Sequence, residues 1–268
     1  MKNVLLLAHD DAGQEARLQC ALDVTRAING TLTCLNVTHF PFFGQEFVTT
    51  AGDMIAFADA QEREARNASE LRRRLAAEGV SWEVLEATGD FADMLVANAA
   101  MTDLIVVSKR LASAEQPDMM AVASRAAMET RALVMVVPED IERLALDRPA
   151  LVAWDGSAPG MAAMRAAMPL LALAKSVTVF TVDEDDKGPS AEHAARYLSR
   201  NGIRAEVTHK KSDGIFPPDV PIRAACDDLR VGFCVMGAYG RSKRIQDLFG
   251  GVTRRMLVKT GCPLLIAH

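Results

Sequence analysis

The sequence predicts an α/β protein built from two tandem, doubly wound parallel sheets of five strands each. Short apolar runs alternate with longer amphipathic segments, as expected for parallel strands that are connected by helices. The order of these segments repeats once, and 268 residues provide enough chain for two domains of ordinary size. We therefore expect domains at residues 1–140 and 148–268 that pack against each other as a pseudo-dimer.

The repeat is visible in four pairs of apolar runs. The run 4–11, Val-Leu-Leu-Leu-Ala-His-Asp-Asp, reappears at 150–157 as Ala-Leu-Val-Ala-Trp-Asp-Gly-Ser. The other pairs are 31–37 with 176–182, 103–108 with 232–237, and 133–137 with 263–267. A charged connector at 138–148, with a proline near each end, separates the two copies.

Periodicity and turn residues place the elements of the first copy. The run 3–9 is apolar nearly throughout, which is typical of a central strand in a parallel sheet. The segment 14–29 carries apolar residues at helical spacing and ends before Gly30, which favours a helix. Further strands are predicted at 31–37, 80–86, 104–107 and 133–137, and further helices at 53–78, 91–100 and 124–130.

The second copy repeats this order. Strands are predicted at 150–154, 176–182, 204–209, 231–236 and 264–267, and helices at 161–174, 190–201, 222–229 and 252–259. The helix at 222–229 is short because Pro217, Pro218 and Pro221 precede it, and proline lacks the backbone donor that a helix interior requires.

Composition limits the classes of partner. Half of the residues are hydrophobic and 24% are charged, which is normal for a globular protein, and a net charge of −5 argues against nucleic acid as a partner. The five cysteines show no C-x2-C spacing, so we expect free thiols in a reducing, cytoplasmic location. The apolar run at the N-terminus is too short for a signal or a membrane span, so no membrane partner is expected.

The most informative stretch is 231–267, which predicts a strand, a glycine turn, a basic loop, a second glycine turn, a helix and a strand. The first turn is Gly237-Ala238-Tyr239-Gly240, the loop begins Arg241-Ser242-Lys243-Arg244, and the second turn is Gly250-Gly251. Glycines at a strand end allow the backbone to approach a ligand closely, and bare N–H groups at a helix start hold anions. The stretch therefore predicts a phosphate site.

This stretch resembles the universal stress protein family. The spacing from Gly237 to Gly240 to Gly250 is similar to the G-x2-G-x9-G-[S/T] nucleotide signature of that family, and residues 262–266, Cys-Pro-Leu-Leu-Ile, resemble its closing strand. Gly251 departs from the expected Ser or Thr, whereas Thr253 matches a second hydroxyl that is often seen there. The resemblance covers nearly the whole chain, but it is specific only at 231–267. It implies a tandem member with the Rossmann-like, adenine nucleotide alpha-hydrolase-like fold.

The resemblance also implies a ligand and a site. The ligand would be ATP, or AMP or ADP, with or without Mg²⁺, in a stress-response protein that forms homodimers. Asp155 would contact the nucleoside, the backbone of Val182 the adenine, and Met236 the base and ribose. The residues expected around the phosphates are Gly237, Gly240, Arg241, Gly250, Gly251, Val252 and Thr253.

Physical reasoning agrees with this site but leaves simpler alternatives open. In an open parallel sheet, ligands bind beyond the carboxyl ends of the strands, where the first and fourth strands diverge. However, residues 155–157, Asp-Gly-Ser, also form an ordinary strand-to-helix turn with a cap, and the basic loop is equally typical of a solvated surface. The hydroxyl that is missing at Gly251 costs one hydrogen bond, about 0.5–1.5 kcal/mol.

The first copy lacks these features. Residues 108–111, Ser-Lys-Arg-Leu, replace the first glycine turn, and no glycine occurs between Gly89 and Pro138. Asp10 is placed opposite Asp155, but side chains replace the phosphate cradle, so we expect this copy to be nucleotide-free. A metal or acid–base cluster at 9–11, His-Asp-Asp, is disfavoured because adjacent side chains at a strand end point in different directions.

Three functions remain. The first is binding of an adenine nucleotide by the second copy. The second is a nucleotide-free module that binds a protein or lipophilic ligand through surfaces such as the Phe-rich segment 39–51, which could equally fold back on its own domain. The third, slow ATP hydrolysis, is disfavoured because the sequence shows no positioned general base near the phosphates, so we expect no catalytic residues.

Overall fold

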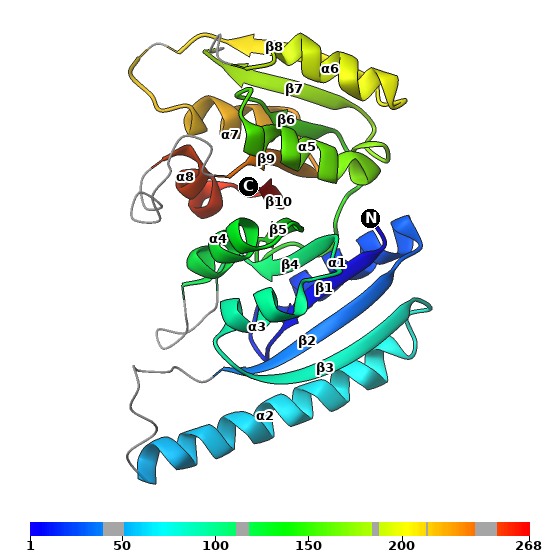
Figure 1. Ribbon diagram of the computed structural model, residues 1–268, viewed down its shortest axis with the longest axis vertical. Helices are drawn as coiled ribbons and strands as arrows, with labels where there is room; N and C mark the ends of the chain where they lie inside the picture. Colours follow the sequence, from blue (N-terminus) through cyan, green and yellow to red (C-terminus); the bar gives the residue numbers. More distant parts are fainter. Residues whose placement is uncertain (40–50, 111–117, 184–187, 213, 239–250) are drawn as a thin grey trace.

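The computed structural model describes residues 1–39, 51–110, 118–183, 188–212, 214–238 and 251–268 (Figure 1). The N-terminal half of the chain comprises β1 (Asn3–Ala8), α1 (Gln14–Ile28), β2 (Thr31–His39), α2 (Ala51–Leu75), β3 (Ser81–Gly89), α3 (Phe91–Asn98), β4 (Leu104–Ser108), α4 (Met119–Glu129) and β5 (Leu133–Val137). The C-terminal half comprises β6 (Ala150–Ala153), α5 (Ala158–Leu171), β7 (Val177–Val182), α6 (Ala191–Arg200), β8 (Ala205–Lys210), α7 (Asp219–Asp228), β9 (Phe233–Gly237), α8 (Val252–Lys259) and β10 (Leu264–Ala267).

The ten strands form one continuous sheet in the order β3-β2-β1-β4-β5-β10-β9-β6-β7-β8. Within each half, all neighbouring strands are parallel, and both halves show the same order when counted from their own first strand. Helices α1, α2, α5 and α6 cover one face with one buried cluster, and α3, α4, α7 and α8 cover the other with a second cluster. The predicted α/β fold class is confirmed.

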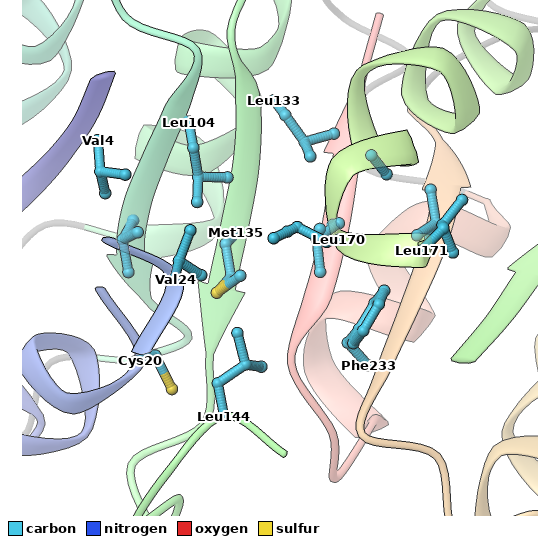
Figure 2. Close-up of a cluster of buried hydrophobic side chains, with 14 of the residues drawn as sticks. Val4, Cys20, Val24, Leu104, Leu133, Met135, Leu144, Leu170, Leu171 and Phe233 are labelled. Carbon is cyan, nitrogen blue, oxygen red and sulfur yellow. The ribbon is translucent and has the colours of Figure 1, made fainter. Parts of the chain in front are cut away.

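The two halves meet through one antiparallel pair, β5 with β10. Val136 lies opposite Leu264, Met135 opposite Leu265, and Val134 opposite Ile266. This register is symmetric about the Met135–Leu265 pair, so the halves are related by a local pseudo-twofold axis, and the two predicted five-stranded sheets merge into one. Figure 2 shows Met135 between the helix residues Val24 of the N-terminal half and Leu170 of the C-terminal half.

Four helices begin earlier than the sequence predicts: α2 at Ala51 rather than at 53, α5 at Ala158 rather than at 161, and α4 and α7 as follows. Helix α4 begins at Met119 rather than at 124, because the Asp118 carboxylate caps it by accepting a hydrogen bond from Met120 N at 3.0 Å. Helix α7 begins at Asp219 rather than at 222, with Pro221 in its first turn. Proline is tolerated there because the first backbone N–H groups of a helix have no partner within the helix.

The junction gives a first test. Met135 is 0% exposed and Met101 is 84% exposed, so they form a matched pair of methionines. We expect Met135→Ala to lower the free energy of unfolding by about 2–5 kcal/mol and Met101→Ala to change it by less than about 0.5 kcal/mol. Urea unfolding followed by circular dichroism measures both, and similar small effects would contradict a core that crosses the junction.

Candidate functional site

Three predicted site residues lie at the same edge of the C-terminal half. Ala153 pairs with Phe180 of β7 on one side and with Met236 of β9 on the other. Asp155 lies two residues after the end of β6, while Val182 and Gly237 end β7 and β9, so all three lie at the carboxyl edge. The side chain of Met236 is buried just beneath this edge. Gly240, Arg241 and Gly250 lie outside the described residues, as does most of the Phe-rich segment.

Asp155 takes part in the turn into α5. Its side chain is exposed, and Oδ1 accepts a hydrogen bond from Ser157 N at 3.0 Å. Ser157 in turn caps α5 by accepting a hydrogen bond from Gly160 N at 3.1 Å. The capped-turn interpretation therefore describes this segment correctly, and the same carboxylate remains exposed at the strand edge.

Gly237 is explained by packing within the protein. A Cβ atom at this position would overlap with Gly160 N and Pro159 C at the start of α5, and the φ angle of Gly237 lies outside the left-handed region. The sequence reasoning attributed this glycine to the approach of a ligand. The structure shows that the close approach of α5 to β9 already excludes a side chain here.

Gly251 opens α8 in a conformation that only glycine adopts easily. Its φ and ψ are 147° and 178°, and a Cβ atom would meet no neighbour within 4 Å. No side chain among the described residues caps α8, so the backbone N–H groups of its first turn, which includes Val252 and Thr253, have no capping partner there. A serine, which the resemblance leads one to expect at 251, would strain this backbone.

An ion pair between Arg255, which is partly exposed, and a buried carboxylate anchors α8 one turn further on. Arg255 Nε donates a hydrogen bond to Asp219 Oδ1 from α7, and Asp219 is 0% exposed. Arg223 Nη2 lies 3.6 Å from the second oxygen of the same carboxylate. The N-terminal half has a weaker counterpart, with 3.5 Å between Arg125 Nη1 and Asp90 Oδ1. The start of α8 is therefore held firmly against α7.

The strand register corrects one correspondence between the halves. Val4 pairs with Leu104 and Ala150 pairs with Phe233, and these are equivalent positions in the repeat. Counting forward from Val4 and Ala150 places His9, rather than Asp10, at the position of Asp155. The predicted equivalence of Asp10 and Asp155 is therefore wrong by one residue, because it compared acid types instead of strand positions.

His9 fills this edge in the N-terminal half at the position equivalent to Asp155. Its Nδ1 lies 2.8 Å from Glu64 Oε1 of α2 and 3.4 Å from the carbonyl oxygen of Val37, and both side chains are buried. Val37 is the counterpart of Val182. A buried imidazole and a buried carboxylate therefore lie beside Val37 at this edge of the N-terminal half.

The side chain of Arg17 lies at the carboxyl ends of the neighbouring strands β1 and β4. This side chain is 0% exposed, and its guanidinium donates to the carbonyl oxygens of Leu7 and His9, each at 3.0 Å. It also donates to both oxygens of Asp11, at 3.0 and 2.7 Å, and to Ser108 Oγ. By the same count, the counterpart of Arg17 in the C-terminal half is Ala163.

The helix start at this edge is also occupied in the N-terminal half. Asp118 caps α4 with its carboxylate, whereas the equivalent start of α8 has no capping side chain among the described residues. Hydrogen-bonding side chains of the protein, those of His9, Arg17 and Asp118, therefore stand at these three positions in the N-terminal half. The C-terminal half has Asp155, Ala163 and Gly251 at the corresponding places.

The structure also shows a cleft of about 570 Å³ away from this edge. It lies between the halves and is lined by residues that precede β1, β4 and β5, together with the outer side of α5. It contains none of the predicted site residues, so it is a separate feature. Among the described residues, no group of His, Cys, Asp or Glu side chains is placed to hold a metal ion, and no helix combines the length and apolar character needed to cross a bilayer.

Sequence reasoning missed the roles of Arg17, Glu64 and Asp219. A signal for Arg17 was present, because this arginine interrupts the apolar face of α1 between Ala16 and Leu18. The partners of Glu64 and Asp219 lie 55 and 36 residues away in the sequence, so no local pattern indicates them.

Solved structures match the fold over nearly the whole chain. A universal stress protein from Archaeoglobus fulgidus gives a TM-score of 0.73 at 17% identity, over 98% of this chain and 95% of that chain. A protein from Pseudomonas aeruginosa that is provisionally classed as a universal stress protein gives 0.61 at 16% identity, over 100% and 93%. A second protein from that organism, of unknown function, gives 0.62 at 16% identity, over 100% and 92%.

No protein-family model matches the sequence, and no curated protein matches it either. At these identities the similarity shows the fold, which is that of the universal stress protein from Archaeoglobus fulgidus.

The buried guanidinium gives a second test. We expect Arg17→Met to lower the free energy of unfolding by about 3–5 kcal/mol, because it leaves the Asp11 carboxylate buried without its partner. Arg73→Met is the control and should change it by less than about 0.5 kcal/mol, since that side chain is 80% exposed. The double variant Arg17→Met/Asp11→Ala should cost less than the sum of the two single changes. Strict additivity in urea unfolding would contradict the pair.

Proposed function

We propose that this chain is a tandem universal stress protein in which residues 148–268 form a domain that binds ATP or another adenine nucleotide. Residues 1–140 form a second domain of the same fold that binds no nucleotide. The fold shared with the universal stress protein from Archaeoglobus fulgidus and the glycine spacing at 237, 240 and 250 support this assignment. The proposal includes a stress-response role.

The observation that carries the proposal is the difference between the two helix starts. A helix N-terminus presents unpaired N–H groups and a partial positive charge, which favour an anion. In the N-terminal half the carboxylate of Asp118 supplies that anion. At α8, Gly251 supplies none, and the phosphates of a nucleotide would satisfy the same donors.

The remaining positions of the edge agree with this assignment. Ala163 and Gly160 stand where Arg17 and Gln14 lie in the N-terminal half. Both positions are buried, and neither carries a polar side chain that closes the edge from within. The exposed carboxylate of Asp155 can accept a hydrogen bond from a ribose hydroxyl. Val182 ends β7 at the same edge and offers its backbone to an adenine.

We place the protein in the reducing cytoplasm and infer that whole chains pair as a homodimer. The five cysteines are free thiols, and burial raises the pKa of Cys20 and Cys34 to about 12, which keeps these two thiols protonated and unreactive. Sedimentation velocity measures the pairing, and a single species with the mass of one chain would contradict it.

Calorimetric titration tests the nucleotide site. Wild-type protein should bind ATP, and it should bind adenosine more weakly because adenosine lacks the phosphates. The variant Ser157→Asp/Ala163→Arg transfers the Arg17–Asp11 pair of the N-terminal half into the C-terminal half, and it should abolish binding because the protein's own ion pair then occupies the edge where we propose that the nucleotide binds. The Ser157→Asp change is included because an arginine introduced without a carboxylate partner could itself attract phosphate.

The control variant is Ser157→Asp/Leu173→Arg, which carries the same charges with the arginine at a side chain that is already exposed. It should bind ATP like the wild type, and both variants should keep the wild-type circular dichroism spectrum. ATP binding that survives Ser157→Asp/Ala163→Arg would place the nucleotide elsewhere. Absence of binding by the wild type would overturn the proposal and favour the nucleotide-free interaction module.

A further inference from the structure

The pseudo-twofold axis creates two equivalent grooves between the halves. In each groove, the amino-terminal ends of the strands of one half face the first helix of the other half. One groove is bordered by α1 and the other by α5, because these helices occupy equivalent places in the repeat. Val4 and Ala150 occupy equivalent positions in the two halves and lie 146 residues apart. Each residue of α1 therefore corresponds to the residue of α5 that is 146 positions later.

The connector between the halves fills the groove beside α1. Leu144 is 4% exposed and lies beside Cys20 and Val24 of α1 (Figure 2). Its backbone N donates a hydrogen bond to Asp23 Oδ2 at 2.9 Å. The carbonyl oxygen of Ala145 lies so close to Gly232 that a Cβ atom at 232 would overlap with it. An aliphatic side chain on an irregular backbone therefore completes this interface.

The groove beside α5 is the cleft of about 570 Å³, and none of the described residues fills it. Its walls include Met168 and Pro169 of α5, which are the counterparts of Leu22 and Asp23, and Met1 and Ile203 add apolar surface. The equivalent of Gly232 here is Asp103, whose carboxylate accepts hydrogen bonds from Lys2 N at 2.6 Å and Asn3 N at 2.9 Å. The main chain of an occupant cannot approach Asp103 as closely as the main chain of the connector approaches Gly232, because the Asp103 side chain takes up that space. The occupant must therefore make its contacts through its own side chains.

The charge of this groove is positive. Arg131, which precedes β5, and Arg165 of α5 both line it, and both are exposed. The guanidinium of Arg165 lies over the Tyr197 ring at 5.4 Å from its centroid, which holds the charge near the groove. The carboxylate of Asp103 already accepts hydrogen bonds from two backbone amides. The two arginines are therefore the charged side chains of the groove that an occupant can pair with.

We propose that the groove beside α5 is a docking site for an extended segment of a partner protein that carries an aliphatic residue flanked by acidic side chains. The aliphatic side chain takes the role that Leu144 has in the equivalent groove. The acidic side chains pair with Arg131 and Arg165, which supplies specificity for acidic over basic segments. This proposal does not depend on the nucleotide site, which lies at the opposite ends of the strands.

The probe is a fluorescein-labelled peptide, Glu-Glu-Leu-Ala-Leu-Asp, whose last four residues copy the connector from Leu144 to Asp147. Fluorescence anisotropy with the full chain measures its binding. Replacing both leucines of the peptide by serine should weaken binding, because the apolar contact is lost. The variant Arg131→Glu/Arg165→Glu should weaken binding by about tenfold or more, because both ion pairs become repulsive.

The control variant Arg73→Glu/Arg196→Glu changes the net charge equally at exposed arginines outside the groove, and it should leave the affinity unchanged. Equal loss in both charge variants would show general electrostatic attraction and overturn the proposal. An affinity for the peptide that is unchanged in Arg131→Glu/Arg165→Glu, or no binding at millimolar peptide, would also overturn the proposal. Circular dichroism of each variant establishes that the fold is intact.

Discussion

The antiparallel pairing of β5 with β10 is the constraint on which the rest of this structure depends. Each half alone would leave the fifth strand as a sheet edge with unpaired backbone groups, and such edges are prone to aggregation. Pairing the two edges removes both and places Met135 and Leu265 at a local symmetry centre. The helices α1 and α5 then pack across the same junction and build one buried cluster from both halves.

Once the halves share a sheet, equivalent positions can be compared residue by residue, and their differences become informative. In the N-terminal half the carboxyl edge is closed by a polar network of the chain itself, with Arg17 at its centre. A buried charge is costly to desolvate, so it persists only where its hydrogen bonds are satisfied, as they are for Arg17. The C-terminal half has smaller side chains at the same backbone positions, and no side chain among the described residues caps the start of α8.

The same comparison explains why the two grooves at the junction differ. A single connector joins the halves, so it can fill only one of two equivalent places. It fills the groove where Gly232 admits a carbonyl oxygen, and the other groove carries Asp103 at that position. Internal symmetry therefore produces two carboxyl edges and two grooves. Single residues decide which edge and which groove are filled by the protein's own side chains or connector.

The sequence by itself determined the number and order of the strands, the existence of the repeat and the bounds of elements such as β5, α8 and β10. These follow from apolar periodicity and turn residues, which act over a few neighbouring positions. It also indicated which half carries the glycine spacing at 237, 240 and 250. Only the tertiary structure decided that Gly237 is required by α5, that His9 rather than Asp10 stands opposite Asp155, and that Arg17 closes the N-terminal edge. These depend on contacts between residues far apart in the chain, and such contacts exist only after the helices have docked on the sheet.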